Sequence, residues 1–127
     1  MNKSKIEIPI FFSTDDNYVP FLTVALHSII ENASTDYNYK VIILNSELKP
    51  ENVQKIAELE NENFKVEFAD VNKKIEDVSK NMTLGLRDYY SNSIYYRIFI
   101  PSLFPDYKKA LYLDADIVVI DDISKLY

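Results

Sequence analysis

Apolar and polar positions follow two periods in the first part of the chain, and these periods predict strands and helices in turn. Short apolar runs at residues 6–13, 40–44 and 64–71 predict three strands. Between them, apolar residues recur at helical spacing in residues 19–30 and 50–62. Because strands and helices alternate, we predict an α/β fold with a mainly parallel central sheet flanked by helices.

The pattern weakens after residue 72. It indicates a short helix at residues 73–80, a loop at 81–86, and an aromatic-rich helix at 91–104 that Pro101 and Pro105 bring to an end.

Two further apolar runs, at residues 108–113 and 117–120, predict a fourth and a fifth strand. Only Asp114, Ala115 and Asp116 separate them. No repeat or linker divides the chain, so residues 1–127 are expected to form a single domain.

Composition excludes several kinds of site. The single glycine rules out the glycine-rich phosphate loops, and the absence of cysteine rules out disulfides, zinc-thiolate sites and cysteine nucleophiles. A net charge of −6 argues against a nucleic-acid partner. The apolar runs are too short for a signal sequence or a transmembrane helix, so we expect a soluble, cytoplasmic protein.

Acidic residues follow two of the predicted strands. Asp15, Asp16 and Asn17 come after the first strand, and Asp114 and Asp116 come after the fourth. In an open parallel sheet, ligands bind outside the carboxyl ends of the strands. If both strands run in the same direction, the two acidic groups meet at one edge of the sheet.

Asp114 and Asp116 form the stronger candidate site. In extended chain, side chains two residues apart lie on the same side, and two carboxylates about 4 Å apart repel by roughly 4 kcal/mol at an effective dielectric of 20. A divalent cation such as Mg²⁺ or Mn²⁺, shared with substrate phosphates, would relieve this repulsion. The alternative is that one aspartate caps the turn while the other faces solvent.

The sequence Tyr-Leu-Asp-Ala-Asp-Ile-Val-Val at residues 112–119 resembles the DxD element of GT-A glycosyltransferases of family 8. That family includes bacterial galactosyl- and glucosyltransferases of surface polysaccharides, and glycogenin. Residues 12–18 resemble its uridine-binding turn, 24–29 the helix that follows, and 93–98 its Tyr-x-Arg helix.

The resemblance implies a Rossmann-like GT-A nucleotide-sugar-binding domain in a metal-dependent enzyme of polysaccharide biosynthesis. It implies Mn²⁺ or Mg²⁺ as cofactor and UDP-glucose or UDP-galactose as donor. The sugar would be transferred to a glycan or lipid-glycan acceptor with retention of configuration.

The resemblance also implies a role for each matching residue. Asp15 would accept a hydrogen bond from uracil, Asn17 would hold the nucleoside, and Tyr18 would stack on the base. Asp114 and Asp116 would bind the metal, with Asp114 also near the ribose. Arg97 would reach the diphosphate or donor sugar and would form the catalytic set together with the two aspartates. Ser13 and Ala115 would also bind the donor.

The chain also departs from the family. Members are usually longer, and the additional part carries a metal-binding histidine, whereas the sole histidine here is His27, expected to be partly buried in the first helix. We therefore expect the N-terminal part of a longer enzyme, with little or no activity alone. Any contact with a membrane would be peripheral, at its inner face, and would be made by the C-terminal part that the longer family members have. The sequence does not predict the oligomeric state.

Three alternatives remain at this point. A receiver-type phosphoacceptor domain would use Asp15, Asp16 and Asp70. A phosphatase of the haloacid dehalogenase type would use Asp114 and Asp116, although that family places the motif near its N-terminus. A catalytically silent UDP-sugar-binding module is the third.

Capping explains several aspartates without a ligand. Asp and Asn are favoured caps of a following helix, at about 1 kcal/mol each. We assign Asp16 to the cap of the first helix, and expect Asp121 and Asp122 to cap a helix after them.

Overall fold

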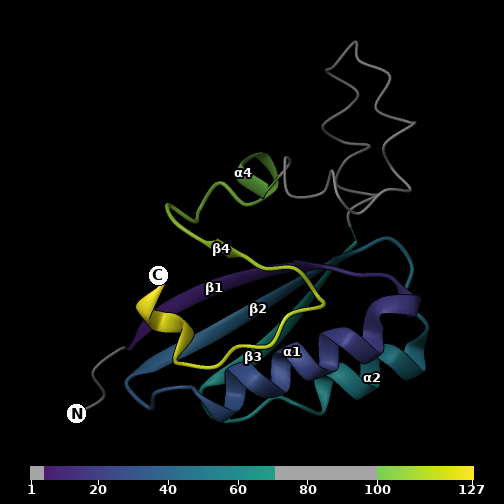
Figure 1. The fold of residues 1–127 in the computed structure, drawn as a ribbon. Coiled ribbons are helices and arrows are strands. Elements are labelled where there is room, and N and C mark those ends of the chain that lie inside the picture. The colour runs from purple at the N-terminus through teal and green to yellow at the C-terminus, as the bar shows by residue number, and fades with distance from the viewer. Residues whose placement is uncertain (1–4, 71–99) are drawn as a thin grey trace.

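A four-stranded sheet with the strand order β3-β2-β1-β4 is the centre of the computed structural model, which describes residues 5–70 and 100–127 (Figure 1). Every neighbouring pair of strands is parallel. The strands are β1 (Ile6–Ser13), β2 (Tyr37–Asn45), β3 (Phe64–Asp70) and β4 (Leu111–Tyr112). The predicted α/β class with a parallel sheet is confirmed.

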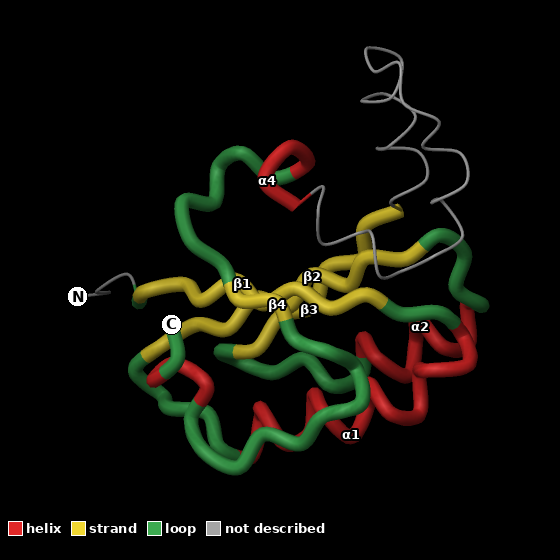
Figure 2. Tube along the Cα trace, turned by 45° about the horizontal axis from the view of Figure 1, so that its top comes forward, coloured by secondary structure: helices red, strands yellow, loops and turns green. Residues whose placement is uncertain are grey.

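Helices cover both faces of this sheet (Figure 2). On one face lie α1 (Val19–Glu31), preceded by the one-turn helix η1 (Asp16–Tyr18), and α2 (Pro50–Ala57). The short helix α4 (Ile100–Leu103) lies on the other face. The chain ends with another one-turn helix, η4 (Ile123–Lys125).

The two central strands are buried on both sides, as expected for a parallel sheet covered by helices. Residues 41–45 of β2 are all buried, and so are residues 8–12 of β1. The larger core lies on the side of α1 and includes Ile10, Phe12 and Leu26. The smaller core lies on the other face, where the ring of Phe11 packs edge-on against that of Phe104, with centroids 5.0 Å apart.

The predicted boundaries hold best where the apolar pattern is strongest. β1, α1 and β3 match the predictions to within a residue, whereas β2 begins three residues earlier than predicted. The polar start of β2 concealed this extension, because Tyr39 buries its ring while its hydroxyl makes hydrogen bonds.

The second helix is shorter than predicted and ends at Ala57 rather than residue 62. After Ala57 the backbone tightens, since Leu59 and Glu60 donate to carbonyls three residues back. The Asn61 side chain then accepts from the N–H of Asn63, a local turn that competes with helix and leads into β3.

Neither strand predicted around Asp114 has its predicted extent. The fourth strand is only Leu111–Tyr112 instead of residues 108–113, because only these residues pair with β1. Residues 117–120 form no strand, which makes the fifth predicted strand wrong. They run beside α1, whose Ser28 and Asn32 side chains, rather than another strand, bind the backbone of Val119.

The predicted helix at residues 91–104 is described only in its last part, where α4 ends before Phe104 and Pro105. The predicted helix at 73–80 and loop at 81–86 lie outside the described residues.

Backbone conformation and helix length complete the picture. No described residue has a positive φ, so every described turn closes without a left-handed residue. In residues 5–70 and 100–127, no helix has the length and apolar character needed to cross a membrane.

Candidate functional site

The order of the strands defines where a ligand would be expected. From β1 the chain moves outward to β2 and then β3, and it returns to pair β4 on the opposite side of β1. The order of connection therefore reverses between β1 and β4. In open α/β sheets, ligands bind in the crevice at the carboxyl ends of the two strands that flank such a reversal.

The ends of β1 and β4 are in register at this reversal. Phe11 pairs with Tyr112, and the N–H of Leu113 donates to the carbonyl of Phe11 over 2.9 Å. The hydroxyl of Tyr112 donates to Oγ of Ser13 over 3.1 Å. The loop that carries Asp15 and the turn that carries Asp114 thus leave two bonded strands at the same edge, as predicted from the sequence.

The loop after β1 is bound to β2 at Thr14 and exposed to solvent at Asp15. Thr14 is buried and donates its N–H to the carbonyl of Leu44. Asp15 is exposed, and one of its carboxylate oxygens, Oδ1, accepts from the N–H of Tyr18 over 3.1 Å. The cap of η1 therefore uses one oxygen of Asp15, and its second oxygen has no protein partner in the described part of the chain.

Aromatic surface adjoins this loop. The rings of Tyr18 and Phe21 are each about half exposed, at 49% and 54%, and lie tilted with centroids 6.0 Å apart. Asn17 is exposed beside them in η1. These residues offer a flat apolar surface and an amide next to the carboxylate of Asp15.

Asp16 does not cap the first helix as predicted, but binds residues at the start of α2. Its Oδ1 accepts from the N–H of Lys49 over 3.0 Å and from the amide of Asn52 over 2.7 Å. These two hydrogen bonds lower the pKa of the Asp16 carboxyl. Because β1 and β2 are neighbours, the loops that leave them meet, and Asp16 binds the start of α2 instead of α1.

Ala115 and Asp116 form a turn directly after Asp114, so the alternation of side chains along a strand cannot be used to align the two carboxylates. Exposure still divides the three residues: Ala115 packs into the core on the side of α1, and both aspartates are exposed. Within residues 5–70 and 100–127, neither carboxylate has a hydrogen-bond or ion-pair partner. This distinguishes them from the capping aspartates of the same chain.

A pair of exposed carboxylates fits a hard divalent cation that keeps other ligands. Mg²⁺ commonly uses one or two carboxylates and completes its shell with water and substrate phosphates. No group of three or more His, Asp, Glu or Cys side chains that could enclose a metal occurs among the described residues. Asp114 and Asp116 can therefore hold an open site but not a closed one.

The other residues singled out in the sequence lie elsewhere. Arg97 is outside the described residues. His27 is exposed on α1 rather than partly buried as expected. Asp70 ends β3, which β2 separates from β1, so the adjacency of first and third strands that a receiver domain requires is absent.

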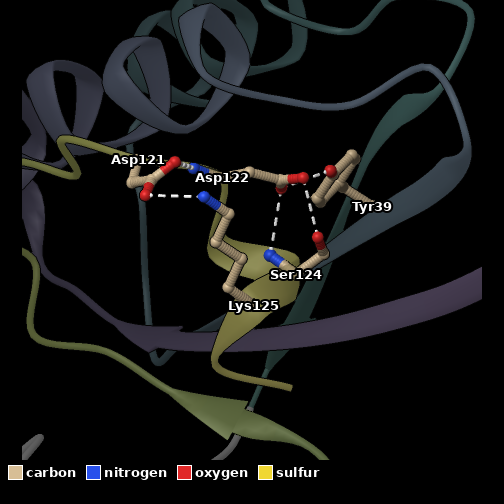
Figure 3. A network of polar contacts seen from close by, with 5 residues as sticks. All are labelled: Tyr39, Asp121, Asp122, Ser124 and Lys125. Carbon is tan, nitrogen blue, oxygen red and sulfur yellow. Dashed lines mark hydrogen bonds and ion pairs between the residues drawn. The ribbon is translucent and has the colours of Figure 1, made fainter.

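A polar network that the sequence analysis did not predict lies at the opposite edge of the sheet (Figure 3). The hydroxyl of Tyr39 donates to Oδ1 of Asp122 over 2.6 Å, and the same carboxylate accepts from the N–H and hydroxyl of Ser124. Burial, followed by the bond to Asp122, raises the pKa of Tyr39 to about 12. Burial acts to raise the pKa of Asp122, but its hydrogen bonds prevail and lower it.

Two neighbouring expectations can be judged here. Asp122 caps η4 as predicted. Asp121 instead accepts from the N–H of Asp122 and pairs with Lys125 at 2.9 Å, contacts that lower the pKa of Asp121. A tyrosine within a polar stretch of a strand gives no sequence signal for such a network.

Comparison with known proteins adds to this geometry. The model of "Glycosyl transferase family 8" matches residues 9–127. General stress protein A of Bacillus subtilis is 28% identical over 130 residues, which cover 100% of this chain and 43% of that protein.

Solved structures agree. The bifunctional glycosyltransferase WbbM aligns with a TM-score of 0.79 and 28% identity over 99% of this chain and 22% of its own. The galactosyltransferase LgtC, solved in complex with donor and acceptor sugar analogs, aligns with a TM-score of 0.65 and 26% identity, over 94% of this chain and 41% of its own. The chain therefore spans less than half the length of these relatives.

Proposed function

Because the chain belongs to glycosyl transferase family 8, we propose that it is the donor-binding part of a metal-dependent glycosyltransferase that takes a UDP-hexose. The fold is that of GT-A glycosyltransferases, and membership of the family supports a transferase. The metal, the uridine nucleotide and the hexose are the proposed refinements.

One observation carries the proposal. The strand order reverses between β1 and β4, and the turn that leaves β4 presents two exposed carboxylates without protein partners in the described residues. The oxygens of a carboxylate in such a position are available to an external cation. The diphosphate of a nucleotide sugar would supply the remaining negative ligands.

The loop after β1 is proposed to bind the nucleoside. Asp15 has an oxygen left over from its cap and would accept from the N–H of uracil, while Tyr18 stacks on the base. Asn17 would hold the nucleoside from the same helical turn. Ser13 and Ala115, at the ends of the two paired strands, would line the donor between base and metal.

Asp114 and Asp116 are proposed to hold Mn²⁺ or Mg²⁺ against the diphosphate, with Asp114 also near the ribose. The bound cation supplies Lewis-acid stabilisation of the charge that develops on the departing UDP. Arg97 would reach the diphosphate or donor sugar and complete the catalytic set. Retention of configuration follows from the resemblance to the family.

Donor and acceptor are proposed at the level of class. UDP-glucose and UDP-galactose are the candidate donors, and a glycan or lipid-glycan of a bacterial surface polysaccharide is the candidate acceptor. A third metal ligand and most acceptor contacts would come from sequence that the longer relatives have in addition. A cytoplasmic location, in reach of nucleotide sugars, fits this role.

Calorimetric titration of this chain with UDP, with Mn²⁺ present or with EDTA, tests the proposal. We expect UDP to bind in the presence of Mn²⁺, and we expect Asp116→Ala to abolish most of this metal-dependent binding. Asp121→Ala is the matched control, because it removes the same charge from the opposite edge of the sheet.

Two outcomes would contradict the proposal: UDP binding that Mn²⁺ does not strengthen, or equal losses in Asp116→Ala and Asp121→Ala. Metal-dependent UDP binding without release of sugar from UDP-glucose or UDP-galactose would identify the chain as a binding module that is silent by itself.

A further inference from the structure

Residues 117–122, here called the crossing segment, join the two edges of the sheet. The segment begins directly after Asp116 at the carboxyl edge and ends at η4, near the start of β1 (Figure 1). Its residues belong to no strand. Its course must therefore be fixed by contacts other than pairing within a sheet.

The first of these contacts is made by side chains of α1, which bind the backbone of Val119. The N–H of Val119 donates to Oγ of Ser28 over 2.8 Å, and the carbonyl of Val119 accepts from Nδ2 of Asn32 over 3.0 Å. Ser28 is buried and donates its own proton to the carbonyl of Ala25 over 2.6 Å. Both polar backbone groups of Val119 are thus bound by side chains of a single helix.

The second contact closes the far end of the segment. Asp122 accepts from the hydroxyl of Tyr39, which also accepts from the N–H of Ser34 over 2.8 Å (Figure 3). The ring of Tyr39 is 1% exposed, so its hydroxyl has a fixed position at the base of β2. The last residue of the segment, Asp122, is therefore bound to a buried tyrosine of β2.

Ala115 anchors the turn in the core, but few backbone hydrogen bonds hold Asp114 and Asp116 on the β4 side. β4 contributes two paired residues, and one further backbone bond runs from Leu113 to Phe11. If the crossing segment were not bound, the backbone around Asp116 would be held on one side only. With Val119 and Asp122 both bound, Asp116 is only three residues from a fixed point.

We propose that Ser28, Asn32, Tyr39 and Asp122 are positioning residues for the metal-binding turn: by fixing the crossing segment, they hold Asp114 and Asp116 in the arrangement that binds the cation. This inference rests on the proposed function. It adds residues outside the donor site whose hydroxyl, amide and carboxylate groups set metal affinity without touching metal or donor.

The test compares single-group deletions with matched controls in this chain. Ser28→Ala and Tyr39→Phe each remove one hydroxyl that fixes the crossing segment. Thr23→Ala removes a hydroxyl that makes the same kind of bond, from Thr23 to the carbonyl of Pro20 over 2.7 Å, but touches no part of the segment. Tyr37→Phe removes a hydroxyl two residues from Tyr39 on the same strand.

The measured quantity is the apparent Mn²⁺ affinity at saturating UDP, followed by the electron paramagnetic resonance of free Mn²⁺. It is taken at a temperature where circular dichroism shows every variant to be folded. We expect Ser28→Ala and Tyr39→Phe to weaken Mn²⁺ binding roughly threefold or more. The controls should bind Mn²⁺ as the unmodified chain does, and UDP affinity in EDTA should be the same in all.

Amide hydrogen exchange supplies a readout that is independent of any ligand. In the unmodified chain the Val119 amide should be protected, and Ser28→Ala should remove that protection. If Ser28→Ala does not fold, Asn32→Ala, which removes the donor to the Val119 carbonyl, replaces it in the Mn²⁺ titration.

Equal Mn²⁺ affinity in the segment variants and the unmodified chain would overturn the inference, as would equal losses in the controls. These outcomes differ from failure of the proposed function, in which the unmodified chain itself shows no metal-dependent UDP binding. Loss in Asp116→Ala without loss in Ser28→Ala or Tyr39→Phe would therefore refute the positioning role alone.

Discussion

The two edges of the sheet use aspartate in opposite ways. At the amino edge, Asp122 accepts three hydrogen bonds from Tyr39 and Ser124, and Asp121 pairs with Lys125. At the carboxyl edge, Asp114 and Asp116 have no such partner in residues 5–70 and 100–127. The same residue type stabilises the fold at one edge and is available to a ligand at the other.

This difference separates carboxylates that are bound within the fold from carboxylates that are exposed and available to a ligand. A carboxylate that caps a helix or accepts from a buried hydroxyl adds to the stability of the folded chain. Asp114 and Asp116 make no such contact in the described residues, so their oxygens are available to a ligand. The predictions below test whether stability and ligand binding do divide between the edges.

The largest expected effect is at the carboxyl edge and is seen only with ligand. At concentrations a hundred times the dissociation constant, Mn²⁺ and UDP should raise the free energy of unfolding of the unmodified chain by about 2.7 kcal/mol. Asp116→Ala should lose this increase and, without ligand, should be at least as stable as the unmodified chain. Urea denaturation with and without ligand measures both, and a destabilised unliganded Asp116→Ala would contradict the contrast.

At the amino edge, Asp122→Ala should lower the free energy of unfolding by about 2 kcal/mol, because it leaves the buried Tyr39 hydroxyl without its acceptor and removes the cap of η4. The pKa of Asp122 is lowered in the folded chain, so its contribution is complete above the unfolded pKa and is lost as pH falls through the folded one. Urea denaturation at pH 7 and pH 3 should show the difference between variant and unmodified chain shrinking in acid.

Tyr39→Phe should cost less, about 1 kcal/mol, since one hydrogen bond is lost and the ring is kept. Folding raises the pKa of Tyr39 from 10.0 to about 12, so its contribution is complete below pH 10 and is lost as pH rises to 12. Denaturation between pH 9 and pH 12 should therefore show a smaller alkaline loss in Tyr39→Phe than in Tyr37→Phe. Equal losses would mean that Tyr39 ionises freely.

The smallest effect is expected from Lys125→Met. The Lys125 and Asp121 side chains are 70% and 66% exposed, and exposed pairs of this kind contribute little. Thermal denaturation should show no measurable change, and added salt should not distinguish the variant from the unmodified chain. A clear loss of stability would show that the amino edge depends on this pair as well as on Tyr39.

The sequence predicted the structure best where burial of one surface alone determined the pattern of apolar residues. β1 and α1 follow their hydrophobic periods closely, because one surface of each must be buried. The meeting of the two acidic loops could also be predicted, since parallel strands bring their carboxyl ends to one edge.

It was least informative where side chains replace backbone pairing. Residues 117–120 are apolar and β-branched, yet Val119 is bound by Ser28 and Asn32, which are distant in sequence. Adjacency in the chain predicts that Asp16 caps α1. In the structure, the pairing of β1 with β2 brings the N–H of Lys49 to the Asp16 carboxylate instead. Periodicity reports which residues are buried, and it carries no information on such distant pairs.

The backbone of the described residues never enters the left-handed region. Positions 15, 114 and 116 therefore demand no particular residue for steric reasons, and a substitution there forgoes side-chain chemistry but adds no torsional strain. Residues at this edge can consequently be substituted while the sheet beneath them stays intact. Libraries randomised at these three positions should yield folded proteins in high proportion, which makes them suitable for finding which side chains the proposed site requires.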